Sequence, residues 1–175
     1  MSSTKLFCYK MKFDRRFAPN PFFDTLTLAT CKPKIRRSSN VDEGTWIAGW
    51  TSKALKYCST EVGDERLVYL ARVKKKLIFA QYWEEYRDKR PILSMGKHDD
   101  HYWGDNIYKP IYDPINNEIV DYEQIPNCDH TSEQKDGDLS GEKVIIFGEF
   151  YYFSSKENKP LFIDSKIKPD IINKG

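Results

Sequence analysis

The clearest β-strand in the sequence is RLVYLARV, at residues 66–73. It is rich in β-branched, aliphatic and aromatic side chains, which favour a pleated sheet. The lysines at residues 74–76 follow directly, and we interpret them as a solvated turn that also deters edge pairing. A second strong signal, KVIIFGEFYYFS at residues 143–154, predicts a pair of strands with a bend or bulge at Gly148. Both stretches indicate a mainly β protein.

Weaker signals add further strands and a helix. Alternating side chains predict strands at residues 6–12 and 45–50, and residues 25–30 predict a short strand or the start of a helix. In FAQYWEEYRDKR, at residues 79–90, aromatic side chains recur every three or four positions. That spacing predicts a short helix, which ends at Pro91 because proline cannot continue it.

Residues 96–141 have the composition of long loops, with few aliphatic side chains and many Asp, Asn, Pro and Gly. A β-hairpin is predicted near residues 114–118, and loops this long usually carry function or motion. The polar tail, residues 156–175, is expected to be partly disordered, with an edge contact at residues 161–163. We therefore predict a single domain, residues 1–175, built as a small barrel or strongly curved sheet with inserted loops.

The overall composition excludes several classes of protein. There are 28 basic and 26 acidic residues, a net charge of +2, so any nucleic-acid binding must come from local basic patches. We find no signal-peptide core and no membrane-length apolar run. Widely spaced cysteines without that signal predict reduced thiols in a soluble, cytoplasmic protein. The four cysteines are Cys8, Cys31, Cys58 and Cys128. The motifs of dinucleotide-binding proteins, P-loop proteins, serine hydrolases and zincins are absent.

The segment at residues 17–37 combines prolines, an asparagine and basic side chains. Two flanking prolines hold Asn20 in an ordered turn, where its amide can read the edge of a base. The candidates for holding phosphate are Lys32, Lys34, Arg36 and Arg37. Cys31 is a weak candidate nucleophile, because only nearby lysines favour its thiolate. The alternative is a structural loop packed by phenylalanines and followed by a solvated basic turn, which composition alone favours.

Two predicted strands carry tryptophan and tyrosine. Trp46, Trp50 and Tyr69 can form an aromatic wall on which a base stacks. Ser52 and Lys53 would lie at the rim of that wall. The alternative is that these aromatic side chains belong to the core, which is the commoner environment of tryptophan in a β domain.

A glycine-led turn, WGDNIY at residues 103–108, presents a carboxylate beside an amide. Asp105 can act as a general base or bind a ribose hydroxyl, with Asn106 and Tyr108 as neighbouring ligand-binding candidates. The alternative is an Asx turn, in which Asp and Asn bond to their own backbone.

A metal site can be drawn from three histidines and a cysteine in the predicted loops. These residues are His98, His101, Cys128 and His130. Their spacings are not those of zinc sites, so we predict neither a metal ion nor another cofactor.

Five pieces of the sequence occur in an order that carries a resemblance to a known family. They are FAPNPF (17–22), LATCKPKIR (28–36), GTWIAGWTSK (44–53), LVYLARVKKKLIFAQYW (67–83) and GDNIY (104–108). Together they resemble the bacterial and phage family called nucleotide modification associated domain, type 2. Thr45 and Trp50 depart from the family pattern at the suspected wall of the pocket, so ligand preference can differ.

The resemblance implies a role beside systems that modify bases in DNA or respond to modified bases, including phage defence. A looser similarity to PUA-like barrels implies an α+β, mainly β fold: a small PUA-like curved sheet or barrel with one or two short helices and long inserted loops. Our leading hypothesis is a binding module for a modified base, nucleotide or DNA. One alternative is an enzyme on a nucleotide or base, with Asp105 as general base and Cys31 or Lys32 assisting. The other is an interaction subunit with protein partners from such a system and no membrane contact.

Overall fold

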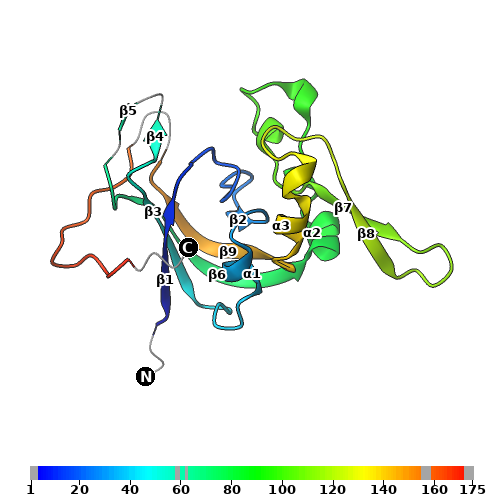
Figure 1. Ribbon diagram of the computed structural model, residues 1–175, viewed down its shortest axis with the longest axis horizontal. Coiled ribbons are helices and arrows are strands. Elements are labelled where there is room, and N and C mark those ends of the chain that lie inside the picture. Colours follow the sequence, from blue (N-terminus) through cyan, green and yellow to red (C-terminus); the bar gives the residue numbers. More distant parts are fainter. Residues whose placement is uncertain (1–3, 58–59, 62, 155–158, 172–175) are drawn as a thin grey trace. The chain divides into compact units, whose positions relative to one another are not determined.

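The computed structural model describes residues 4–57, 60–61, 63–154 and 159–171. Its largest element is a five-stranded sheet with the strand order β1-β3-β6-β9-β2 (Figure 1). The strands are β1 (Leu6–Met11), β3 (Trp46–Thr51), β6 (Leu67–Ile78), β9 (Lys143–Tyr152) and β2 (Thr27–Leu28). The protein is mostly sheet with a few short helices, as predicted. Because β1 and β2 are edge strands, the described sheet is not closed, and the predicted barrel is not confirmed.

The chain divides into two compact units. The first comprises Met1–Arg15, Asp42–Lys74 and Phe147–Gly175. The second comprises Arg16–Val41 and Lys75–Ile146. Strands β6 and β9 each contribute residues to both. The single-domain expectation stays a prediction.

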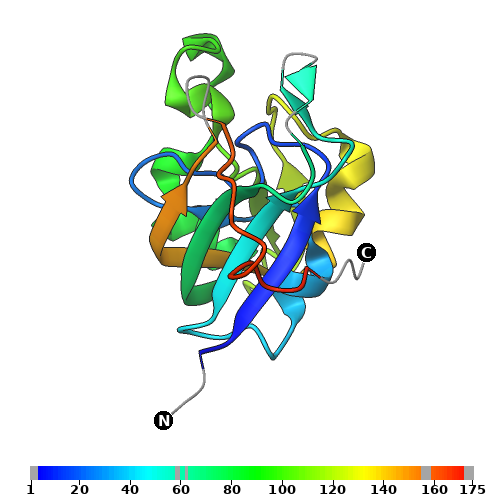
Figure 2. The same cartoon turned by 90° about the vertical axis from the view of Figure 1, so that its left-hand side faces the viewer.

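The first unit is built on three strands that lie side by side (Figure 2). β1 pairs with β3 in parallel, and β3 pairs with β6 in antiparallel fashion with a register shift after Gly49. A Cβ at Gly49 would lie 2.3 Å from the Tyr69 ring, so only glycine fits at that position. Leu161 pairs with Leu67, which confirms an edge contact in the tail. The remaining strands of the unit, β4 (Lys56–Tyr57) and β5 (Thr60–Glu61), pair with each other.

The second unit carries the helices. Its elements after β2 are α1 (Pro33–Arg37), α2 (Phe79–Glu85), η1 (Arg87–Lys89), η2 (Leu93–Met95), η3 (Asp100–Trp103), β7 (Tyr108–Tyr112), β8 (Ile119–Gln124), η4 (Ser132–Gln134) and α3 (Lys135–Leu139). β2 pairs with β9, and β7 pairs with β8 as the predicted hairpin. Phe17, Phe79, Tyr82, Ile107 and Val144 are among the buried residues of its core cluster. This unit holds most of the buried polar side chains described below.

Strand β6 confirms the strand predicted at residues 66–73, but the turn predicted at the lysine run is wrong. The strand continues to Ile78, with Val73 and Leu77 buried and Lys74 exposed between them. A lysine residue can form the backbone hydrogen bonds of a strand and can point its side chain to solvent. The three lysines therefore continue the strand. Lys76, for example, remains in the strand while its Nζ donates to the Ser38 carbonyl at 2.7 Å.

The strand pair predicted at residues 143–154 is also wrong, because the segment forms the single strand β9. Gly148 lies within that strand, and the side chain of Lys74 lies 3.3 Å from the position that a Cβ would take there. The glycine therefore makes room for a neighbouring side chain and does not reverse the chain.

The helix predicted at residues 79–90 begins where predicted, because α2 starts at Phe79. It ends at Glu85, five residues before the predicted end. Tyr86 leaves the helical region, with φ −118° and ψ 57°, and a 3-10 turn follows. Strand β2 confirms the strand option for residues 25–30. The disorder expected in the tail falls partly on residues 156–158 and 172–175, which lie outside the described residues. Among the residues that are described, no helix has the length and apolarity needed to span a membrane.

Candidate active site

Cys31 lies at a sharp turn between strand β2 and helix α1. Its φ is 57° and that of Lys32 is 44°, so two successive non-glycine residues adopt the left-handed conformation. That conformation is unfavourable for side chains with a Cβ, and it concentrates at functional sites. Pro33 at the first turn then starts α1 with its φ already fixed. A strand-to-helix turn of this kind exposes a nucleophile, and Cys31 is exposed.

His130 lies beside the sulfur of Cys31. The Cys31 Sγ and the His130 Nε2 are 3.6 Å apart. The imidazole is buried, and its ring centroid lies 5.1 Å from that of Phe17. The backbone N–H of His130 donates to Asn127 Oδ1 at 2.7 Å, and its carbonyl accepts from Gln124 Nε2 at 2.9 Å. Packing and hydrogen bonds together fix the position of this histidine.

Asp138, on helix α3, completes the arrangement. Its Oδ2 lies 2.6 Å from the His130 Nδ1 and accepts from the Tyr108 hydroxyl at 2.8 Å. Its Oδ1 accepts from the backbone N–H of Cys31 at 2.6 Å. Both oxygens of this buried carboxylate therefore have partners. Cys31, His130 and Asp138 thus form a connected series of thiol, imidazole and carboxylate, which resembles the arrangement used in nucleophilic catalysis.

Arg36 donates hydrogen bonds to three backbone carbonyls around Cys31 and Asp138. Its Nε donates to the Cys31 carbonyl at 2.7 Å, one terminal nitrogen donates to the Lys143 carbonyl at 2.8 Å, and the other donates to the Asp138 carbonyl. The side chain is fully buried, and burial lowers its pKa to about 10. A Cβ at Gly141 would lie 2.4 Å from the guanidinium carbon, so the glycine makes room for it.

The protonation of His130 follows from its neighbours. Burial lowers the pKa of the imidazole, but hydrogen bonds to Asp138 and Cys31 outweigh that effect and raise it to about 10. Asp129 Oδ1, 3.9 Å from Nε2, adds a further acidic neighbour. At neutral pH the ring is therefore an imidazolium that lies between a sulfur and a carboxylate.

Two buried polar atoms beside this group have no hydrogen-bond partner in the described part of the chain. They are the Thr30 Oγ1, adjacent in sequence to Cys31, and the Gln124 Oε1, whose amide nitrogen binds the His130 carbonyl. Thr30 is fully buried. Buried polar groups in native proteins are almost always paired with protein or with water.

A second buried polar network surrounds Asn20. The Lys89 Nζ donates to the Asn20 Oδ1 at 2.8 Å and to the Thr25 carbonyl at 2.7 Å. The Asn20 Nδ2 donates to the Trp103 carbonyl at 2.8 Å. Burial lowers the pKa of Lys89 to about 8, against an opposing effect of Asp105. Asn20 thus binds loop backbone and an ammonium group.

Asp105 and Asn106 belong to the same buried region. Asp105 Oδ2 accepts from the Thr27 hydroxyl at 2.7 Å, and its Oδ1 accepts from the Tyr82 hydroxyl at 2.6 Å. Burial raises the pKa of Asp105, and these donors together with Lys89 oppose the rise. The Asn106 Nδ2 donates to the Tyr82 and Tyr86 carbonyls, both at 3.0 Å, at the end of α2. The Asp105 carboxylate and the Asn106 amide nitrogen therefore bind groups of the fold itself.

The family model described as nucleotide modification associated domain 2 matches residues 3–173. The chain belongs to this family. Neither the curated proteins nor the solved structures contain a match. Association with nucleotide modification is thus the functional information that the family name supplies.

In this member of the family, the predicted aromatic residues lie in the first unit. Trp50 and Tyr69 are buried in its core, and the Tyr69 hydroxyl donates to that of Tyr9 at 2.9 Å. Trp46 and Ser52 are half-buried and Lys53 is exposed. Two surface grooves of the unit, of about 180 and 340 Å³, are lined by other residues.

The second unit holds the remaining predicted residues, and sequence reasoning grouped them differently. Cys31 and Tyr108 meet around Asp138, whereas Asn20, Asp105 and Asn106 belong to the buried network. Lys32 is half-buried at the start of α1. Arg36 was predicted to hold phosphate, but its side chain is buried and donates to three carbonyls.

Asp138 was missed, and His130 was considered only as a metal ligand. Within the described residues, no group of three or more His, Cys, Asp and Glu side chains is arranged to hold a metal. His101 pairs instead with Asp99, at 2.8 Å. No local motif marks Asp138, because 107 positions separate it from Cys31.

Proposed function

We propose that this chain is an enzyme of a nucleotide-modification system, acting on a nucleotide or a DNA base with Cys31 as its nucleophile. The observation that carries the proposal is the contact of the Cys31 sulfur with His130, whose other nitrogen is bound to Asp138. A thiol with a base at hydrogen-bond distance, and a carboxylate behind that base, is the signature of covalent catalysis.

The three side chains would take distinct roles. The thiolate of Cys31 attacks the substrate, and His130 carries the proton that the thiol loses. Asp138 holds the imidazole in one orientation and stabilises its charged form. Asp105, the general base of the earlier alternative, is fully buried and its oxygens accept from two hydroxyls, so Cys31 and His130 are the better candidates.

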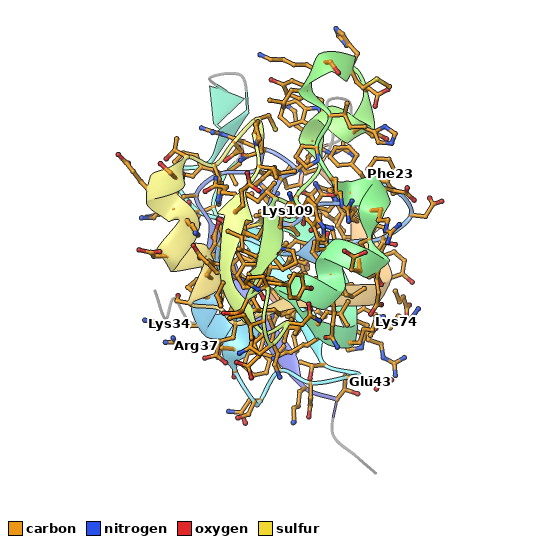
Figure 3. All side chains as sticks on the ribbon, turned by 90° about the vertical axis from the view of Figure 1, so that its right-hand side faces the viewer. Phe23, Lys34, Arg37, Glu43, Lys74 and Lys109 are labelled. Carbon is orange, nitrogen blue, oxygen red and sulfur yellow. The ribbon has the colours of Figure 1, made fainter. Side chains whose placement is uncertain are left out.

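Basic side chains beside Cys31 support an anionic substrate such as a nucleotide. Lys32 follows the cysteine directly, and Lys34 and Arg37 are exposed on α1. Figure 3 shows Lys34 and Arg37 projecting outward from this helix. In place of Arg36, we assign the attraction of phosphate to these three residues.

Recognition of a modified base without chemistry is the second candidate. The Ser52 Oγ is buried without a hydrogen-bond partner among the described residues, and it lies one residue beyond β3, which begins with the half-buried Trp46. A PUA-like fold and a role in phage defence belong to this proposal. The β-rich structure supports the first, and the family name supports an association with nucleotide modification. A protein-interaction role draws support from apolar side chains exposed on the β7–β8 hairpin, such as Ile115 and Val120.

The experiment incubates the protein with nucleotides and with plain and base-modified DNA, and measures products and covalent adducts by mass spectrometry. Product or adduct should form with the native protein and be lost in Cys31→Ser. His98→Ala, at an exposed loop position, is the matched control and should retain activity. Product that persists in Cys31→Ser contradicts the proposal. Salt-dependent filter binding with no product on any substrate would favour the recognition module.

A further inference from the structure

We infer that the reaction at Cys31 is acyl transfer: the site cleaves an amide or ester linkage on its substrate through a thioester on the Cys31 sulfur. This inference rests on the proposed function and names its reaction class. The substrate would carry an acyl group, as an amide or ester substituent of a base or nucleotide. The argument comes from the position of the nucleophile, the path of the proton and the rigidity of the group.

The nucleophile is presented to substrate while its partner is shielded. Cys31 is exposed at the left-handed turn before α1, whereas His130 is buried behind it. A substrate carbonyl can therefore approach the sulfur from solvent, with the imidazole on the protein side. Hydrogen bonds from its backbone N–H to Asp138 and from Arg36 to its carbonyl hold Cys31 in this left-handed turn before substrate binds.

The proton has a short path in the first step. The Cys31 thiolate attacks the carbonyl carbon, a C–S bond forms, and the carbonyl oxygen takes the negative charge. When that oxygen re-forms the carbonyl, the C–N or C–O bond breaks. The leaving nitrogen or oxygen takes the proton from His130 Nε2, which lies 3.6 Å from the sulfur in this structure. The products of this step are a thioester, a free amine or alcohol, and a neutral imidazole.

The second step restores the enzyme with water alone. Neutral His130 takes a proton from water, and the hydroxide attacks the thioester carbon. The C–S bond breaks, Cys31 leaves as the thiolate beside the imidazolium, and the released carboxylic acid loses its proton to solvent. An amine in place of water would give transfer to a new acceptor. The cycle needs no oxidant, reductant or metal.

The group around the thiol is held rigidly, unlike a chance contact between a cysteine and a histidine. Asp138 Oδ1 binds the Cys31 backbone while its Oδ2 binds His130 and Tyr108, so the carboxylate cannot rotate freely. Arg36 then joins the carbonyls of Cys31 and Asp138 through one buried guanidinium. Acyl transfer benefits from such fixed geometry, because the same histidine must serve both steps.

Within the described residues, two unpaired polar atoms belong to residues that adjoin the triad in the chain or through a hydrogen bond. The Thr30 Oγ1 and the Gln124 Oε1 are buried and unpartnered in the described chain, next to Cys31 and His130 respectively. A hydroxyl can donate to a developing oxyanion, and an amide oxygen can orient water.

The test uses p-nitrophenyl acetate as a minimal acyl donor, with nitrophenol release followed over time and the acetylated cysteine mapped by mass spectrometry. The native chain should turn over repeatedly and carry acetyl on Cys31 during the steady state. Cys31→Ser should lose turnover. His130→Ala should retain acetyl on Cys31 and hydrolyse it at least roughly a hundredfold more slowly, because the base for water is gone. His101→Ala, in a comparable His–Asp pair without the thiol, should behave as the native chain.

The outcomes separate this inference from the proposed function. Stoichiometric acetylation without turnover, in a native chain whose Cys31 alkylation still depends on His130, overturns acyl transfer and leaves the thiol proposal standing. A Cys31 that reacts no faster with iodoacetamide than Cys8 or Cys128 overturns both. Where His130→Ala does not fold, Tyr108→Phe and Asp138→Asn provide the test. Each should slow deacylation, and native rates in both folded variants overturn the inference.

Discussion

The sulfur of Cys31 lies 3.6 Å from Nε2 of His130, although 99 positions separate the two residues in the chain. The contact exists because the turn after β2 and the loop before α3 are brought together in the second unit. Asp138 then fixes both, through the backbone of Cys31 and the ring of His130. The chemistry proposed for this protein depends on that contact.

Protonated His130 should stabilise the fold below neutral pH. Its pKa is raised from an ordinary 6.5 to about 10, so the native state binds the proton more tightly than the unfolded state. The stabilisation is fully present below pH 6.5 and is lost as the pH rises toward 10. We expect His130→Gln to lower the free energy of unfolding by about 2 kcal/mol at pH 6, and by progressively less toward pH 10.

Chemical denaturation of both proteins from pH 6 to 10 measures that difference. The groups that face the imidazole are Asp138, Cys31 and Asp129, and all remain in the variant. Lys89, with a pKa lowered to about 8, adds stability as the pH rises above 8, but it does so equally in both proteins. A difference that is constant across this range would contradict the assigned charge of His130.

Gly141→Ala should displace the guanidinium of Arg36. The new Cβ would lie 2.4 Å from its central carbon, and moving the side chain breaks hydrogen bonds to three carbonyls. We expect a loss of about 2–4 kcal/mol in unfolding free energy and slower alkylation of Cys31. Gly137→Ala on α3 is the matched control, because nothing lies within 4 Å of its Cβ and alanine favours a helix. Equal effects from the two substitutions would rule out this role of Arg36.

Asp105→Asn tests whether the buried network is structural. The variant keeps one acceptor oxygen for the Tyr82 and Thr27 hydroxyls, replaces the other with an amide donor, and removes the charge that faces Lys89. Leaving a buried ammonium without compensation should cost about 3–5 kcal/mol of unfolding free energy. Asp121→Asn, which breaks an exposed pair with Lys135, should leave the stability close to that of the native protein. An Asp105→Asn protein with native stability and no activity would instead support Asp105 as a general base.

Thr30→Val separates stability from function. The hydroxyl of Thr30 is buried without a partner in the described chain, so a methyl group of similar size should leave stability unchanged or raise it by about 1 kcal/mol. If substrate or water uses that hydroxyl, turnover of the acyl donor should fall severalfold in the same variant. Thermal unfolding and steady-state kinetics on one preparation give both values. Lower stability with unchanged turnover would mean that the hydroxyl serves the fold alone.

Much of the sheet could be predicted because its signals are local. Alternation and composition located β1, β3 and β6, and aromatic spacing located α2. Sequence reasoning did not predict that β6 continues through its lysines or that β9 is one strand. Lys74–Lys76 and Gly148 resemble turn signals unless their spatial neighbours are known. What decides each case is a tertiary contact, such as the side chain of Lys74 over Gly148.

The site was harder to predict than the sheet. Asn20 was singled out for its flanking prolines, but burial against Lys89, which determines its role, is not visible in sequence. Cys31 was ranked low because its local neighbours are lysines, and the residues that matter to it come from the predicted loop at residues 96–141. Asp138 has no distinguishing neighbours at all, so only the fold reveals the triad.

The most direct test of the central claim is the rate at which iodoacetamide alkylates Cys31, resolved by peptide mass spectrometry at pH 7. Cys31 should react faster than Cys8, whose pKa is raised by burial, and faster than the half-buried Cys128. His130→Ala should slow alkylation of Cys31 about tenfold or more, and His101→Ala should leave it unchanged. A Cys31 rate that is the same in all three proteins would contradict the account.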